Sequence, residues 1–268
     1  MATITKAQGK DGHETLSMQQ LKSKIDWLKT SVQLANATLK ISNRYTNCAS
    51  DREQMLSINF ELDSKTYDKL NQPVKQYNQL QKFVQRKQIH SAIGQLYEFF
   101  TNYLHDVINE ISEYNPQKML VLLKDEHCSN ITLNMSQIKS ATTITDIQKQ
   151  VLKMYFDKLQ ATQHTQDLYS KLVSHTGITI QSQIKWQGIG FMTFRNLLVH
   201  NKGRVSDDFE KNYKGIIHES YRAKIAEGKE LPLEMEILND ACKAIYTLCK
   251  SIDSQLIEKD LVKSRLVK

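Results

Sequence analysis

Glycine and proline are scarce in this chain, which has only 9 Gly and 3 Pro among its 268 residues. These two residues are the strongest local breakers of regular structure, so their scarcity over such a length favours long helices over many short strands. Apolar residues at helical spacing recur in several segments and support the same expectation. The sequence therefore predicts an all-α fold.

The apolar periodicity also predicts where the main helices lie. Capping-box patterns at Ser17 with Gln20 and at Thr145 with Gln148 mark two helix starts. Residues 45–72 give mixed signals and are expected to form a loop with one short helix. The expected helices are 17–44, about 80 to just before Pro116, a short apolar segment at 119–123, 145–174, 183–200 and a closing helix at 233–256.

The expected organisation of the chain has three parts. Residues 1–75 are interpreted as a start that is disordered to about residue 15, because it offers little to bury, followed by an N-terminal helical extension. Residues 76–262 form the main helical domain, and 263–268 form a basic tail that either reaches a phosphate backbone or stays solvated. No apolar leader and no run of eighteen apolar residues is present, so the sequence favours a cytoplasmic protein that does not cross a membrane.

The cysteines and the net charge indicate the redox state of the compartment and the charge of a binding partner. Cys48, Cys128, Cys242 and Cys249 form no C-x-x-C pair, and they are interpreted as buried thiols in a reducing compartment. The formal net charge is +7 and the pI is about 9.0, which favours an anionic partner such as nucleic acid. A basic surface that is merely solvated explains the same charge equally well.

A polar trio interrupts the end of an apolar helical segment and is the strongest candidate for a site. Residues 186–194 are apolar nearly all round a helix, which is typical of a buried helix. Asn196 and His200 are four residues apart and share one helical face, and Arg195 lies beside them with the length to reach round. Gly203 is a candidate C-cap that would end the helix just past His200.

The spacing of this trio resembles the R-x4-6-H signature of HEPN domains, which are the helical domains of many prokaryotic RNases. Residues 195–200 read Arg-Asn-Leu-Leu-Val-His and are followed by Asn201, Lys202 and Gly203. The resemblance covers roughly residues 80 to 260 and implies a HEPN-like up-down bundle. It also implies a homodimer that brings two motifs together in one cleft. The setting that it implies is host defence or a toxin–antitoxin-like system, with RNA as substrate and an antitoxin or defence-system protein as a candidate partner.

The chemistry of the trio suits metal-independent cleavage of RNA. An imidazole titrates near ~6.5 and can move protons near neutral pH, so His200 is the candidate general acid and base. The permanently charged guanidinium of Arg195 can bind phosphate oxygens as charge develops, and Asn196 can hold the imidazole or a phosphate oxygen by a neutral hydrogen bond. Lys202 and Arg204 follow directly, in a segment 202–214 expected to be a mobile loop that meets RNA. No cofactor is expected, and the other histidines lack the ligand spacing of a metal site.

Two further interpretations stay open. Arg195, Asn196 and His200 could simply satisfy helix-end carbonyls and one another, in a non-catalytic helical dimer that binds RNA or a partner protein. Burial separates the alternatives, because a site needs an open His200 beside a basic groove. The aromatic stripe Tyr97, Phe100, Tyr103 and Leu104 is expected to be core or dimer interface, because basic residues do not interleave it.

Overall fold

The computed structural model describes residues 13–47, 55–63, 65–122, 132, 135, 141–161 and 165–266. Nearly all of the secondary structure in this part of the chain is helical, so the prediction of an all-α fold is confirmed. The exceptions are a short antiparallel ladder between β1 (His13–Glu14) and β2 (Arg265–Leu266) and two isolated β-bridges, Met55 with Pro73 and Arg204 with Glu230. The tail predicted as loosely solvated is thus tied, at residues 265 and 266, to the start of the described chain.

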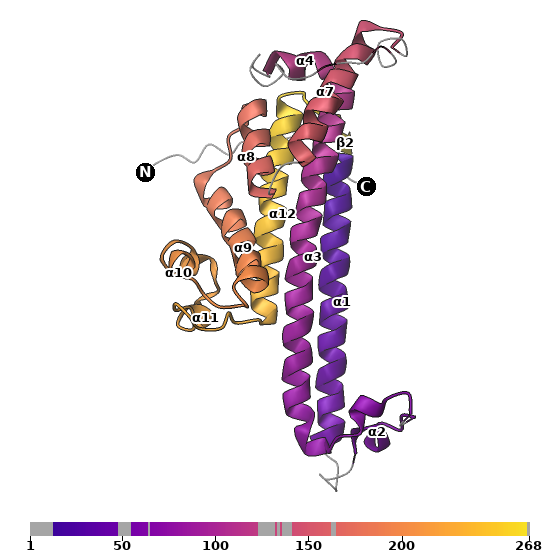
Figure 1. The fold of residues 1–268 in the computed structure, drawn as a ribbon, viewed down its shortest axis with the longest axis vertical. Helices are drawn as coiled ribbons and strands as arrows, with labels where there is room; N and C mark the ends of the chain where they lie inside the picture. The colour runs from indigo at the N-terminus through magenta and orange to yellow at the C-terminus, as the bar shows by residue number, and fades with distance from the viewer. Residues whose placement is uncertain are drawn as a thin grey trace.

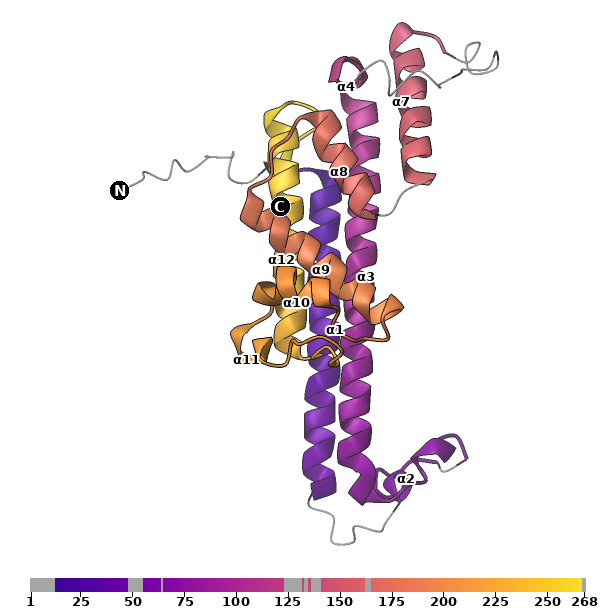
Figure 2. The same ribbon diagram turned by 60° about the vertical axis from the view of Figure 1, so that its left-hand side comes forward.

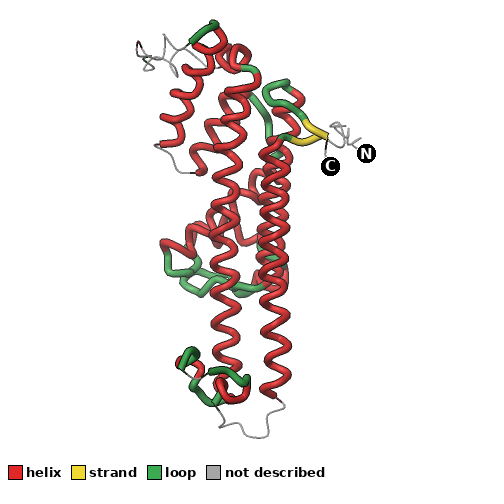
Figure 3. The backbone as a smooth tube through the Cα atoms, turned by 90° about the vertical axis from the view of Figure 1, so that its right-hand side faces the viewer, coloured by secondary structure: helices red, strands yellow, loops and turns green. Residues whose placement is uncertain are grey.

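Two long helices form the axis of the molecule. They are α1 (Leu16–Asn47) and α3 (Tyr77–Tyr114), which lie side by side as an antiparallel pair (Figure 1). The closing helix α12 (Met235–Glu258) packs against both of them over the upper half of the pair. The lower half extends beyond α12 and carries α2 (Leu56–Asn59), the short helix expected within residues 45–72 (Figure 3).

The other helices pack around this three-helix unit. Helix α9 passes in front of α12 and α3, and α1 lies behind them (Figure 2). The elements in chain order after α3 are α4 (Pro116–Leu122), α7 (Ile144–Ala161), α8 (Thr165–Thr176), α9 (Ser182–His200), α10 (Asp207–Tyr213), the 3-10 turn η3 (Lys214–Ile216) and α11 (Glu219–Arg222).

One hydrophobic core runs through α1, α3, α9 and α12. Phe100, Tyr103 and Leu104 of the predicted aromatic stripe are fully buried in it, which confirms them as core residues. Cys242 and Cys249 are buried free thiols, as predicted, whereas the other two cysteines lie outside the described residues. The domain boundary at residues 75/76 stays a prediction. The hydrophobic core extends across this boundary, because the buried face of α1 contributes residues to the core.

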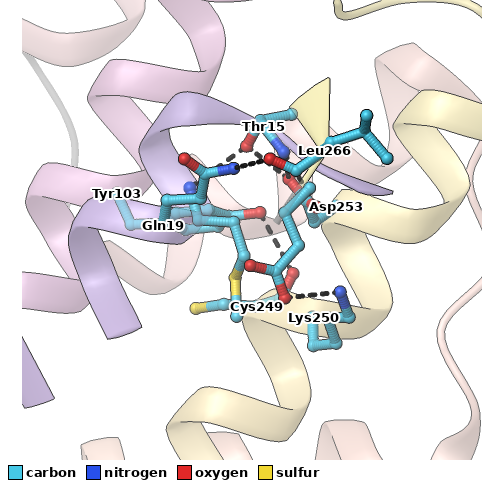
Figure 4. Close-up of polar contacts among 9 residues, drawn as sticks. Thr15, Gln19, Tyr103, Cys249, Lys250, Asp253 and Leu266 are labelled. Atoms are coloured by element: carbon cyan, nitrogen blue, oxygen red, sulfur yellow. Dashed lines mark hydrogen bonds and ion pairs between the residues drawn. The ribbon is translucent and has the colours of Figure 1, made fainter. Parts of the chain in front are cut away.

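The start of α1 is firmly anchored, so the expectation of a loose chain up to about residue 15 is wrong for residues 13–15. Thr15 is fully buried, and its backbone N–H and hydroxyl both donate to the Asp253 carboxylate of α12 (Figure 4). The Thr15 hydroxyl in turn accepts from the Met18 N–H at 3.1 Å, so Thr15, and not Ser17, caps the helix. The Ser17 N–H donates to Glu110 of α3 at 2.8 Å. Two carboxylates therefore meet the positive end of the α1 dipole.

Asp253 makes this anchor dependent on pH. Burial raises the pKa of its carboxyl from 3.8 to about 6, although the Thr15 hydrogen bonds and nearby Lys250 act in the opposite direction. A carboxyl whose pKa is higher in the folded state contributes stability below its unfolded pKa, and that contribution is lost as pH rises through the folded pKa. We therefore expect the melting temperature of the parent protein, minus that of Asp253→Asn, to fall between about pH 4 and pH 7. A difference that is flat or rises over this range would contradict the assignment.

The prediction of one continuous helix over 145–174 is wrong. Helices α7 and α8 are separate, and α8 lies against α3 (Figure 2), where the buried Thr165 hydroxyl lies 2.9 Å from that of Thr101. The start of α7 is also capped earlier than predicted, because the Asp146 N–H donates to the Thr143 hydroxyl at 3.1 Å and the Thr143 N–H donates to the Asp146 carboxylate at 2.8 Å. At the start of α7 polar contacts decide the helix boundary, and apolar spacing does not reveal them.

Candidate functional site

The motif helix α9 is held in place by unusually close packing at two glycines. A Cβ atom at Gly188 would lie 2.5 Å from Cδ2 of Leu248 on α12, and a Cβ atom at Gly190 would lie 2.6 Å from Cδ1 of Ile216 in η3. These distances are too short for any side chain larger than hydrogen unless the neighbours move. Glycine at these positions therefore lets α9 lie directly against α12 and η3, which fixes the direction of the residues at its end.

Arg195 is half-buried and has no acidic partner within the part of the chain that the structure describes. Its guanidinium carbon lies 4.4 Å from the ring centroid of Tyr97 on α3, and Nη1 donates to the Asn196 side-chain oxygen at 3.3 Å. Its Nε is buried and has no hydrogen-bond partner. Among the described residues no carboxylate forms an ion pair with Arg195, so its positive charge is held in place without being neutralised.

His200 is the last residue of α9, and its side chain is exposed. It makes no hydrogen bond or ion pair with any residue that the structure describes. His200 is five positions after Arg195, so the two Cα positions are about 140° apart around the helix axis. The structure thus joins Arg195 to Asn196 by a hydrogen bond, while His200 lies on the same face of α9 as Asn196 and bonds to neither residue.

The helix ends as expected, just past His200. Lys202 and Gly203 both take left-handed backbone conformations, with φ of 53° and 71°, and the Gly203 N–H donates to the Leu197 carbonyl at 3.0 Å. The next residue, Arg204, forms an isolated β-bridge with Glu230. Its guanidinium donates to the Gly228 carbonyl at 3.1 Å, so the two predicted RNA-binding residues have different surroundings.

The expectation of a loop over residues 202–214 is wrong for its second half. Helix α10 occupies Asp207–Tyr213, and the hydroxyl of Ser206 caps it by accepting from the Phe209 N–H at 3.2 Å. The amino groups of two lysines in this stretch are paired with carboxylates one turn earlier. The pairs are Lys211 with Asp207 at 2.8 Å and Lys214 with Glu210 at 3.3 Å. Both pairs have the i,i+4 spacing that can be recognised in the sequence. Among the described residues, Lys202 and Arg204 are therefore the two basic residues of the segment that have no carboxylate partner.

A basic groove of about 320 Å³ lies between α3 and the end of α9. Helix α3 contributes Phe83, Arg86, Lys87 and His90, and Lys202 lines the groove from the motif side. Arg86 is paired with Glu230 at 2.8 Å, whereas the Lys87 ammonium lies over the exposed Phe83 ring, 5.6 Å from its centroid. Leu198, Gly203, Glu230, Leu231 and Leu233 complete the lining. A cation beside an exposed aromatic ring suits a single-stranded nucleic acid, because the cation can bind a phosphate and the ring can stack with a base.

The groove and Arg195 lie along one face of α3. His90 and Tyr97 are seven residues apart, which is about 10 Å along a helix, and Tyr97 carries the Arg195 guanidinium. Between them, a Cβ atom at Gly94 would meet nothing within 4 Å, so the surface there is open. The groove residues of α3 were missed in the sequence because only tertiary packing brings them beside Lys202. Their helical spacing was the one available signal.

Comparisons with protein-family models, with curated protein sequences and with solved structures find no significant match to this chain. Among the residues that the structure describes, no group of three His, Cys, Asp or Glu side chains is placed to hold a metal ion. Nor does any described helix combine the length and the apolar character needed to span a bilayer.

Proposed function

We propose that this protein is a metal-independent endoribonuclease of the HEPN type. His200 acts as general acid and base, Arg195 binds the phosphate as charge develops, and Asn196 orients the Arg195 guanidinium. The observation that carries this proposal is the contrast at the end of α9, where, among the residues that the structure describes, an exposed His200 without a partner follows an Arg195 without a carboxylate partner. A purely structural pair would be expected to satisfy each other or nearby acceptors.

The proposed reaction is a transesterification within RNA. The 2′-oxygen attacks the adjacent phosphorus while an imidazole accepts the hydroxyl proton, and a proton is delivered to the departing 5′-oxygen as its bond to phosphorus breaks. The products are a 2′,3′-cyclic phosphate and a free 5′-hydroxyl. The guanidinium of Arg195 stabilises the extra negative charge on the phosphoryl oxygens in the transition state.

The site is proposed to be complete only in a homodimer. Arg195 and His200 leave α9 at positions about 140° apart, and the Arg195 guanidinium is held over Tyr97 of α3, so we propose that each copy supplies these two groups to different phosphate contacts. The outer face of α9 carries Ile189, Thr193, Asn196 and His200 at helical spacing, and a two-fold axis beside this face would bring two motifs together. The resemblance to HEPN domains further suggests a cytoplasmic role in host defence or a toxin–antitoxin-like system, with an antitoxin or defence-system protein as a partner.

The test of this proposal is incubation of the purified protein with total RNA in the presence of EDTA, beside His200→Ala protein purified in the same way. Cleavage that persists in EDTA, gives 2′,3′-cyclic phosphate ends and is absent from the variant supports the proposal. Undiminished cleavage by the well-folded variant would overturn it. The variant also serves as the control for a contaminating nuclease.

The alternative function is a non-catalytic helical protein that binds RNA. The groove beside Lys202 favours it, because the exposed Phe83 ring and the cations around it suit an RNA strand whether or not the strand is cut. Binding of single-stranded RNA without any cleavage by the parent protein would select this alternative. The same groove would then be the functional site, and the trio would be structural.

RNA binding is expected to depend on Lys202 and Arg204. Lys202→Ala should weaken binding several-fold and lower the slope of log K against log salt by about 0.7, because one phosphate contact is removed. Arg204→Ala should have a smaller effect, because its guanidinium is already bonded to Gly228. Lys211→Ala is the matched control, since that lysine is paired with Asp207. Fluorescence anisotropy with single-stranded RNA at several salt concentrations measures the slope, and an unchanged slope for Lys202→Ala would place the binding surface elsewhere.

A further inference from the structure

Helix α1 exposes three large apolar side chains at intervals of seven residues. Trp27 is 74% exposed, Leu34 is 68% exposed and Ile41 is 55% exposed. Single exposed apolar residues are ordinary, but a row of three at one fixed spacing on one helix forms a continuous surface. We call this row, with the smaller residues Thr30 and Ala37 between its members, the α1 seam.

The α1 seam has the geometry of one half of a coiled coil. Seven residues make nearly two turns, so Trp27, Leu34 and Ile41 lie on one stripe, and Thr30 and Ala37 take the intervening heptad positions on the same face. This face is opposite the one that α1 buries against the core through Leu21, Ile25, Leu28 and Val32. The core therefore does not use the seam, and the two small residues within it would let another helix approach closely.

A hollow of about 440 Å³ lies at the upper end of the seam. Ser23, Asp26, Trp27 and Thr30 form part of its lining on α1. A side chain of the size of isoleucine fits into such a space. The seam thus offers protruding apolar side chains along its length and a recess beside Trp27 that could receive one.

We propose that the α1 seam is covered by the α1 seam of a second copy of this chain, in an antiparallel arrangement. Charge decides the orientation. Asp26 and Lys40 are both exposed and lie fourteen residues apart, so they flank the seam on the same side. In an antiparallel pair centred near Gln33, Asp26 of each copy lies opposite Lys40 of the other. In a parallel pair Asp26 faces Ser31, which carries no charge, and the pairing of Asp26 with Lys40 is lost.

The antiparallel arrangement also accounts for the hollow. With the pair centred near Gln33, Ile41 of each copy lies beside Trp27 of the other, over the recess described above. The two-fold axis repeats every contact, so each apolar and each charged pairing occurs twice. Because α1 and α9 lie on opposite sides of α3 and α12 (Figure 2), this contact leaves Arg195 and His200 uncovered. The proposal therefore does not rest on the nuclease function.

The first test is the mass of the full-length protein in solution. Light scattering at tens of micromolar should give a dimer, or a larger even assembly, and Leu34→Glu should halve the mass with an unchanged helical circular dichroism signal. Ile144→Glu is the matched control, because Ile144 is 76% exposed on α7 and away from the seam. A monomeric parent protein, or an assembly that Leu34→Glu leaves intact, would overturn the proposal. The second outcome would place self-association on another surface, such as the outer face of α9.

The second test is charge reversal, which reports the orientation. Asp26→Lys and Lys40→Glu should each weaken self-association by about tenfold, because both copies then place like charges opposite each other. The double variant should recover the parent affinity, and an equal mixture of the two single variants should form a mixed dimer in preference to either homodimer. A double variant as weak as the single variants, or no preference in the mixture, would contradict the antiparallel pairing.

Discussion

His200→Ala and Arg195→Ala are each expected to slow RNA cleavage by ~10²–10⁴-fold in single-turnover assays. The first change removes the group that moves the proton, and the second removes a charged contact to the transition state, for which losses of ~10²–10³ are typical. The double variant should cleave RNA only slightly more slowly than the less active single variant, because the effects of groups that act together on the rate are not additive. Val199→Ala, which changes an exposed neighbour of His200, should keep full activity.

The stability of the His200→Ala and Arg195→Ala proteins shows whether these two residues are catalytic or only structural. His200 has no hydrogen-bond partner among the described residues, so His200→Ala should leave the melting temperature unchanged. Arg195→Ala removes the contact with Tyr97 and should lower the free energy of unfolding by about 0.5–2 kcal/mol. A large loss of stability in His200→Ala, with no RNase activity in the parent protein, would favour the structural interpretation.

Phe194→Ala is expected to lower the free energy of unfolding by about 3–5 kcal/mol, the largest stability effect that we predict. The Phe194 ring is fully buried, with its centroid 5.8 Å from that of Phe209 on α10 and 6.3 Å from that of Phe191. Removing it leaves a cavity between α9 and α10 and so weakens the support of both the motif helix and the segment after it. Urea unfolding followed by circular dichroism measures the change.

Ile144→Ala is the control for this experiment, because a largely exposed residue should change stability by only about 0.5 kcal/mol or less. Phe194→Leu should fall between the control and Phe194→Ala, since leucine refills part of the cavity. Equal stabilities for Phe194→Ala and the control would show that α9 does not pack on α10 as described.

The helices that the sequence predicted best are those with a long apolar stripe. Helices α1, α3, α9 and α12 end within a few residues of their expected bounds, because the burial of one face determines where they lie. The errors occur where polar groups decide a helix end, locally at Thr143 and Ser206 and over a long sequence distance at Thr15. The backbone N–H of Thr15 donates to a carboxylate 238 residues away. The first residue of α8, Thr165, forms a hydrogen bond with Thr101 of α3.

The candidate site was predictable only in part for a related reason. The trio and Lys202 are neighbours in sequence, so their spacing could be seen directly. The position of the Arg195 guanidinium is set by Tyr97 on another helix, which the local sequence does not show. The groove residues Phe83 and Lys87 precede the motif by more than a hundred positions, and no local pattern connects them to it.

The anchor at the start of α1 also bears on the order of events during synthesis. Glu110, which accepts from Ser17, belongs to α3 and is available as soon as the α1–α3 pair has left the ribosome, whereas Asp253, which accepts from Thr15, is made 143 residues later than Glu110. Chains emerge at about 5–20 residues per second, so the first contact can form several seconds before the second. During that interval the side of α1 that later meets α12 stays uncovered, and the nascent chain offers an apolar helix face to chaperones.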